Sequence, residues 1–238
     1  MNNQWDQLAE TFGAAWDDDT IPACAADNIG IAWPSLLSCI EREFTEFSGL
    51  KALDFGCGGG LFCRLLSQLG FSVTGYDQST ELVKHAMHNT PDEVTITGSD
   101  SVMVQNGGYD LISSIMVLQF IEEIEVVIDQ LVSLLKPDGL IMIAVFNPEF
   151  INDNLNSAAF SGFQQNGYSG YMALQDGVNI PVHNRNDATY RELFESRGLT
   201  AVYLDYPAFT REFLNKHEMP FSTAFPEYQI QGFRCKRT

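Results

Sequence analysis

Short apolar runs alternate with stretches of helical period through the middle of the chain. The runs of strand length are 51–55, 71–76, 94–97, 109–115 and 140–146. The stretches whose apolar positions recur every three or four residues are 61–69, 79–89 and 122–135. Strands and helices that alternate at this spacing predict right-handed βαβ crossovers and a mostly parallel sheet with helices on both faces.

The two ends of the chain break this rhythm. Residues 1–48 have helical character, and Trp5, Leu8, Phe12 and Trp16 fall at spacings that place them on one apolar face. Residues 147–181 show no clear period. A helix over 187–197 follows, and then two strands near 199–206 and 227–236, which predict an antiparallel hairpin at one sheet edge. The segment 136–139 (Lys-Pro-Asp-Gly) is expected to end the preceding helix and turn the chain.

We therefore expect one domain over 1–238 with four parts. These are an N-terminal helical segment (1–48), an α/β core (49–146), an insert (147–182) and a C-terminal helix with a β-hairpin (183–238). A chain of 238 residues with 45% hydrophobic residues is long enough for one sizeable domain with a full core.

Net charge and cysteine content limit the partners and the cellular compartment that we expect. The net charge of −18 disfavours nucleic acid as a partner, and no apolar run is long enough for a membrane helix. The polar, acidic start lacks the features of a signal peptide, and five cysteines without such a signal predict reduced thiols in the cytoplasm. No CxxC or HExxH motif occurs, and His85 with His88 fits a solvated helix face better than a metal site, so we expect no metal.

The most informative segment is Asp54-Phe55-Gly56-Cys57-Gly58-Gly59-Gly60, which follows a strand and opens a helix. Glycines at this place allow a tight turn and the close approach of a ligand to the backbone. The third glycine of a dinucleotide-binding loop would fall at Leu61, which disfavours an NAD-dependent oxidoreductase. The carboxylate of Asp54 suits a ligand with an ammonium group better than a pyrophosphate.

Two further acids follow the next two strands. Asp77 stands where a carboxylate accepts hydrogen bonds from ribose hydroxyls. Asp100, with Ser101 beside it, could accept a hydrogen bond from an adenine amino group. Asp77 could instead cap the following helix, and Asp100 could be an ordinary loop acid. Three acids at successive strand ends beside a glycine loop favour the nucleoside interpretation.

These motifs, with Gly75-Tyr76-Asp77, Gly98-Ser99-Asp100, Tyr109-Asp110-Leu111-Ile112 and Leu135-Lys136-Pro137-Asp138-Gly139-Leu140, resemble the class I S-adenosylmethionine (SAM)-dependent methyltransferases. The likeness is greatest to the small-molecule branch that includes enzymes of ubiquinone and menaquinone biosynthesis. It implies a Rossmann-like, seven-stranded, mostly parallel sheet with a reversed last strand, SAM as cofactor and S-adenosyl-L-homocysteine as product. The cofactor residues it implies are Asp54, Gly56, Cys57, Gly58, Gly60, Asp77, Gln78, Asp100, Ser101 and Ser114.

The acceptor side is less defined by the sequence. Gln119 and Phe120 stand where many relatives have Glu and His, which puts an acid–base or metal role at those positions in doubt. We take His183 as the candidate general base, although it could be a loop histidine bonded to backbone. Arg185 could bind a substrate carboxylate or pair with an acid of the protein. The expected substrate-binding residues are Trp5, Phe12, Gln119, Asn147, Tyr168 and Arg185.

The resemblance predicts a cytoplasmic enzyme that transfers a methyl group from SAM to N, O or C of a small molecule. Aromatic residues of the helical segment and the insert are expected to form a lid over the site. The alternative is a non-methylating SAM-binding regulatory protein, or an enzyme that uses a SAM derivative, with the same fold. A homodimer is one option for its assembly; nucleic acid and membrane are not expected partners.

Overall fold

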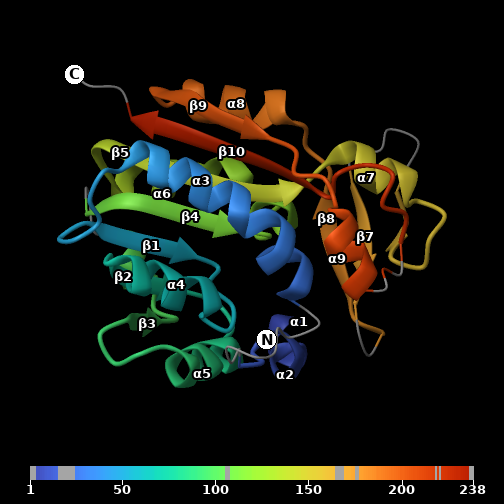
Figure 1. The fold of residues 1–238 in the computed structure, drawn as a ribbon, viewed down its shortest axis with the longest axis horizontal. Coiled ribbons are helices and arrows are strands. Elements are labelled where there is room, and N and C mark those ends of the chain that lie inside the picture. Colours follow the sequence, from blue (N-terminus) through green and yellow to red (C-terminus); the bar gives the residue numbers. More distant parts are fainter. Residues whose placement is uncertain are drawn as a thin grey trace.

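The computed structural model describes residues 4–15, 25–104, 108–163, 169–174, 177–217, 219 and 221–235. A seven-stranded sheet has the order β3-β2-β1-β4-β5-β10-β9 (Figure 1). Its strands are β1 (Lys51–Phe55), β2 (Ser72–Tyr76), β3 (Thr95–Thr97), β4 (Tyr109–Ile115), β5 (Leu135–Phe146), β9 (Leu199–Asp205) and β10 (Tyr228–Cys235). The strands β1 to β5 are parallel, and β10 is antiparallel to both of its neighbours. The predicted α/β fold with a reversed last strand is confirmed.

The strand order reverses beside β1. The chain moves outward from β1 to β2 and β3, then returns to place β4 on the other side of β1. In open α/β sheets a ligand binds at such a point, outside the carboxyl ends of the strands. The ends of β1 and β4, which carry Phe55 and Ile115, therefore mark the expected crevice.

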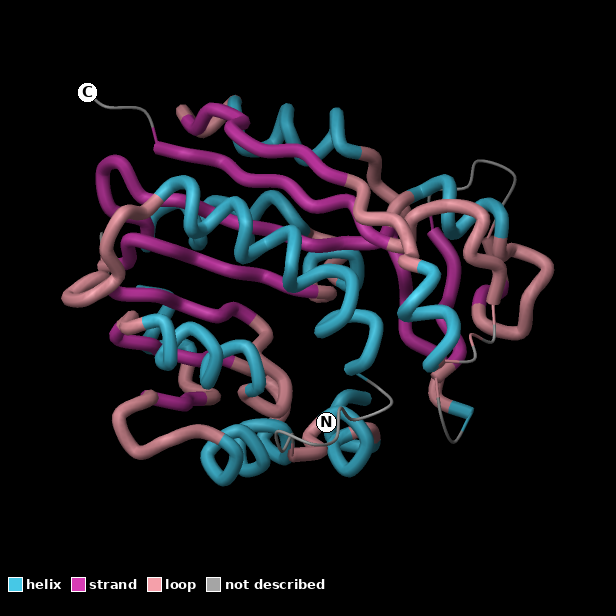
Figure 2. The backbone as a smooth tube through the Cα atoms, in the orientation of Figure 1, coloured by secondary structure: helices cyan, strands magenta, loops and turns pink. Residues whose placement is uncertain are grey.

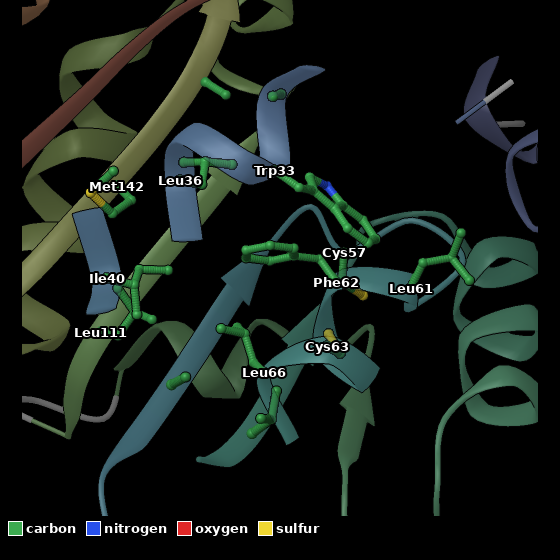
Figure 3. Close-up of a cluster of buried hydrophobic side chains, with 14 of the residues drawn as sticks. Trp33, Leu36, Ile40, Cys57, Leu61, Phe62, Cys63, Leu66, Leu111 and Met142 are labelled. Carbon is green, nitrogen blue, oxygen red and sulfur yellow. The ribbon is translucent and has the colours of Figure 1, made fainter. Parts of the chain in front are cut away.

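Helices cover both faces of the sheet and leave two apolar cores. The helices are α1 (Gln4–Gln7), α2 (Ala9–Phe12), α3 (Trp33–Glu43), α4 (Leu61–Leu69), α5 (Thr80–Asn89), α6 (Ile124–Leu134), α7 (Pro148–Asp153), α8 (Asp187–Glu195) and α9 (Arg211–Lys216). Shorter turns form η2 (Asn28–Ala32), η3 (Asp100–Val104) and η4 (Leu118–Phe120). On one face α3 and α4 bury Leu36, Phe62 and Leu66 against the sheet (Figure 3). On the other, α6 and α8 bury Ile128 and Phe194.

The helix boundaries follow local chemistry that the sequence carries. Ser79 caps α5 by accepting a hydrogen bond from the backbone N–H of Leu82 at 3.2 Å. Gly70 ends α4 with a φ of 110°, a left-handed conformation that side chains disfavour. Apart from the start of β5, the predicted helices and strands of the core agree with the structure to within one or two residues.

Three segments differ from the prediction. Strand β5 begins at Leu135, before the expected turn, and the turn residues form an irregularity in the pairing with β4, where Asp138 has a φ of 64°. The insert contains α7 and a second sheet, ordered β6-β7-β8, of β6 (Phe160–Ser161), β7 (Ser169–Ala173) and β8 (Asn179–His183). Helix α9 lies between the two C-terminal strands, where the sequence predicted only a connection.

The insert and the N-terminal helices meet the sheet at one end. Figure 1 shows β7, β8 and the pair α1–α2 beyond the carboxyl ends of β1 and β4. Figure 2 shows that the strands of the small sheet run across the direction of the main strands. Trp16 lies outside the described residues. The expected lid regions thus lie at the edge where the strand order reverses.

Candidate functional site

The glycine loop after β1 is held against the end of β2. The backbone N–H groups of Gly56 and Cys57 donate to the carbonyl of Tyr76 at 2.7 and 2.9 Å. Gly56 has a φ of 78°, and a Cβ there would lie 2.3 Å from the Val117 side chain. Gly58, with a φ of 52°, faces open space at its Cα. The loop therefore presents bare backbone to the rim, as close approach of a ligand requires.

Asp77 connects this loop to helix α5. Its Oδ2 accepts from the Gly58 N–H and its Oδ1 from the Ser79 N–H, both at 2.9 Å. The carboxylate is 7% exposed, and burial raises its pKa despite these two backbone hydrogen bonds. The bond to Ser79 agrees with the capping interpretation, and the bond to Gly58 places the acid at the glycine loop. Gln78 is exposed beside it.

Asp54 lies beneath the loop, buried in the sheet. Its carboxylate accepts from the Ser113 hydroxyl at 2.8 Å and faces the Cys63 thiol at 3.5 Å. Burial raises its pKa to about 6, and these two hydrogen bonds oppose the shift. Cys57 is buried and packs in the same core as Cys63 (Figure 3). A negative charge at Asp54 is therefore costly unless a cation approaches the loop.

Asp100 and Ser101 stand exposed at the start of η3. The Tyr76 hydroxyl donates to Asp100 Oδ1 at 2.7 Å, and the Tyr76 ring stacks on Phe55 with a centroid distance of 5.5 Å. Tyr76 was not predicted as a site residue, although it directly precedes Asp77. Its ring and the Asp100 carboxylate together offer an aromatic face and a hydrogen-bond acceptor at the third strand end.

Buried polar groups without hydrogen-bond partners lie at the end of β4 and just after it. Ser114 and Gln119 are buried, and among the described residues neither the Ser114 hydroxyl nor Oε1 of Gln119 has a hydrogen-bond partner. The Gln119 amide nitrogen contacts the Met116 sulfur at 3.4 Å. Met116 has a φ of 56°, which is rare for a side chain of this size and indicates backbone strain. Strain beside unsatisfied buried groups is typical of binding sites.

The N-terminal helices are tied to the elements that make this rim. Asp6 of α1 accepts from the Ser79 hydroxyl at 2.6 Å. Asn89, at the end of α5, donates through its amide to the carbonyls of Gly13 and Gly59 at 3.0 and 2.9 Å. Neither Asp6 nor Asn89 was predicted. Both act between segments far apart in the sequence, so no local pattern marks them.

Aromatic rings form a row from the helical segment to the insert. Trp5 lies 6.0 Å from Phe12 and 5.1 Å from Phe120 between ring centroids. Phe120 continues to Phe146 at 6.4 Å, and Phe146 to Phe160 at 5.6 Å. The row brings together two predicted substrate residues, Trp5 and Phe12. The third aromatic of that prediction, Tyr168, lies outside the described residues.

Two other predicted substrate residues form hydrogen bonds to backbone groups with their side chains. Asn147 caps α7 and donates to the Pro226 carbonyl at 2.9 Å. The Arg185 guanidinium donates to the carbonyls of Leu118, Ile121 and Glu122 at 3.3, 2.8 and 3.1 Å. Since its hydrogen bonds hold the segment after β4, Arg185 positions that segment, and neither of the two roles expected from the sequence accounts for these bonds.

His183 is the last residue of β8, partly buried, with Nδ1 3.3 Å from the Ser169 hydroxyl. Burial lowers its pKa, and the nearby charge of Arg185 lowers it further. A neutral imidazole at physiological pH is a competent proton acceptor. Among the described residues, no group of three or more His, Cys, Asp or Glu side chains could hold a metal ion. No helix within the described part of the chain is long and apolar enough to span a membrane.

The fold and the rim together define an α/β protein whose candidate ligand site lies where the strand order reverses. A family model described as a methyltransferase domain matches residues 34–204. The chain belongs to this methyltransferase domain family.

Individual similar proteins agree with that assignment, although they match a shorter part of the chain or have a lower sequence identity. A ubiquinone biosynthesis O-methyltransferase from Chelativorans sp. is 34% identical over 111 residues, which is 44% of this chain and 44% of the relative. The chain thus matches less than half the length of this curated relative. A SAM-dependent methyltransferase from Mesorhizobium loti has the same fold, with a TM-score of 0.68 and 20% identity, over 88% of this chain and 98% of that one.

A third similar protein is the 1,6-didemethyltoxoflavin-N1-methyltransferase of Burkholderia thailandensis. It superimposes with a TM-score of 0.56 and 16% identity, over 84% of this chain and 76% of the other. At these identities the likeness of solved structures establishes the fold.

Replacement of Asn89 tests how the helical segment is attached. Asn89→Ala removes both hydrogen bonds that join Gly13 to Gly59, so we expect amide hydrogen exchange in 4–13 to rise by about threefold to thirtyfold. The core strands should keep their protection. His88→Ala, an exposed neighbour on the same helix, is the matched control and should exchange as the wild type. Equal exchange of 4–13 in both variants would contradict the tethering role of Asn89.

Proposed function

We propose that this protein is a SAM-dependent methyltransferase that methylates a small molecule. One observation carries the proposal: the glycine loop, Asp54, Asp77 and Asp100 lie at the carboxyl ends of the neighbouring strands β1, β2 and β3, beside the point where the strand order reverses. Membership in the methyltransferase domain family supports it. The names of the similar proteins, an O-methyltransferase and an N1-methyltransferase, agree with it and leave the acceptor atom open among N, O and C.

The residues at the rim fit the parts of SAM. The bare backbone at Gly58, above the buried carboxylate of Asp54, suits the methionine end with its ammonium group. Asp77 would accept from the ribose hydroxyls, exchanging backbone partners for ligand donors. Asp100, Ser101 and the Tyr76 ring would hold the adenine. Bound SAM supplies a methyl group on a positively charged sulfur.

What the chain must then do is place the acceptor, exclude water and accept a proton where the nucleophile carries one. The partly exposed rings of Trp5, Phe12 and Phe120 fit an acceptor with a flat or apolar body, and the buried rings of Phe146 and Phe160 support Phe120 from behind. His183, neutral at physiological pH, is the proposed general base. The position of α1, α2 and the insert beyond the carboxyl ends of β1 and β4 favours a small molecule over a nucleic acid, which the net charge of −18 would repel (Figure 1).

We propose that the protein works in the cytoplasm, because Cys39, Cys57, Cys63 and Cys235 are unpaired in the described structure. The alternative function, SAM binding without methyl transfer, has no support from the comparisons.

The first test replaces Asp77. Asp77→Asn should weaken binding of SAM and S-adenosylhomocysteine by about tenfold to a hundredfold, because the amide offers one acceptor fewer to the ribose and repels the Gly58 N–H. Titration calorimetry measures this, with the exposed Asp92→Asn as control. Deuteromethyl-labelled SAM with a metabolite extract should also yield a labelled product. Wild-type affinity in Asp77→Asn, or no nucleoside binding by the native protein, would refute the proposed site.

The second test uses pH. The raised pKa of Asp54, about 6, means that the free protein loses the carboxylate charge as pH falls through 6. An ammonium-bearing ligand gains only from the ionised form, so its binding releases a proton and weakens at low pH. We expect affinity for S-adenosylhomocysteine to fall by up to about tenfold per pH unit below pH 6. Asp54→Asn should be weaker at neutral pH and lack this component; parallel profiles would contradict the role.

The third test concerns proton transfer. His183→Asn should lower kcat by about a hundredfold or more while leaving calorimetric affinity for S-adenosylhomocysteine unchanged, since general bases contribute on this scale. The reaction of the wild type should also fall away at pH values below the lowered pKa of His183. A full kcat in His183→Asn would show that proton removal occurs elsewhere or is not needed.

A further inference from the structure

A pair of carboxylates lies outside the rim described so far. Asp27 caps the start of η2, where it accepts from the Asn28 N–H at 2.8 Å, and it is partly exposed. Glu227 directly precedes β10 and is 3% exposed. The two side chains contact each other, and the hydroxyl of the fully buried Tyr228 faces Asp27. The pair thus joins the N-terminal helical segment to the last strand.

The pair has no positive partner within the described residues. No Lys, Arg or His nitrogen there lies within 4.0 Å of either carboxylate. Burial raises the pKa of both groups, and the charge of Asp27 raises that of Glu227 further. Two adjacent buried acids titrate as a coupled pair, because the negative charge of each disfavours that of the other.

The hydrogen-bonding capacity of the cluster is also incomplete. Within the described structure, Oε2 of Glu227 and the hydroxyl of Tyr228 are buried without a partner of ordinary hydrogen-bond geometry. Buried polar groups are seldom left in this state, because each unsatisfied group costs about 1–3 kcal/mol. A ligand that brings hydrogen-bond donors and one positive charge would satisfy both deficits.

The position of the pair places it on the acceptor side. Tyr228 pairs with Phe146, the ring at the centre of the aromatic row, and the Glu227 carbonyl accepts from the Asn147 N–H at 2.8 Å. Strand β10 is two positions from β4 in the sheet, and strands lie about 4.8 Å apart. Glu227 therefore stands about 10 Å along the carboxyl edge from the strained end of β4.

We propose that Asp27 and Glu227 bind a cationic amine group of the methyl acceptor. The acceptor is then a small molecule with an aromatic or apolar body, which lies against the partly exposed rings of Trp5 and Phe120, and a basic nitrogen that docks on the pair. This inference rests on the proposed function and adds the substrate class to it. The basic nitrogen needs only to bind to Asp27 and Glu227, so the atom that receives the methyl group can be a different atom of the acceptor.

The test compares matched ligands on the protein loaded with S-adenosylhomocysteine. The probes are 2-arylethylamines and the corresponding 2-arylethanols, which have the same body and differ in charge. Thermal stabilisation should be larger for the amines, and Glu227→Gln should weaken their binding by about tenfold or more. Glu149→Gln is the matched control, because it makes the same change in net charge on the wall of a neighbouring hollow of about 380 Å³.

The outcomes separate the two proposals. An amine preference that is lost in Glu227→Gln and kept in Glu149→Gln supports the pair. Equal stabilisation by amines and alcohols, or a preference that survives Glu227→Gln, overturns it. Failure of S-adenosylhomocysteine itself to stabilise the protein would instead refute the proposed function. In the extract labelled from deuteromethyl SAM, the product should bind a cation exchanger, and a labelled product that is neutral or acidic would also overturn the inference.

Discussion

The site depends on the adjacency of three strand ends, those of β2, β1 and β4. The chain leaves β1 in one direction and returns on the other side, so no crossover covers the gap between β1 and β4. The same adjacency lets Tyr76 at the end of β2 hold the amides of Gly56 and Cys57 through one carbonyl. Asp77 then fixes Gly58 to the start of α5. The loop conformation is thus a consequence of strand order as much as of its glycines.

Buried carboxylates are the second feature that the carboxyl edge of the sheet has in common. Asp54, Asp77, Asp27 and Glu227 all have pKa values raised chiefly by loss of water. Such groups cost free energy unless a positive charge or hydrogen-bond donors approach them, and natural proteins retain them chiefly at sites that bind something. Under the proposed function, a sulfonium nucleoside with an ammonium group would supply that complement for the first two acids, and a basic acceptor would supply it for the other two.

The features predictable from the sequence are those encoded locally. The glycine loop, the cap at Ser79 and the end of α4 at Gly70 depend on residues a few positions apart, and they were placed correctly. The small sheet of the insert was missed because its strands have only two to five residues, too few to show a clear periodic pattern in the sequence. Helix α9, of six residues, is too short to show one. Arg185 was assigned substrate or surface roles because its carbonyl partners lie more than sixty positions away.

The residues on the acceptor side could not be predicted from the sequence, because they come from segments that are far apart in the chain. Its aromatic row takes one ring each from α1, η4, the end of β5 and the insert, so no single segment contains the pattern. The pair of Asp27 and Glu227 comes from opposite ends of the chain. Such a site can change its acceptor by single substitutions in any of these segments while the nucleoside rim, held by strand order, stays intact.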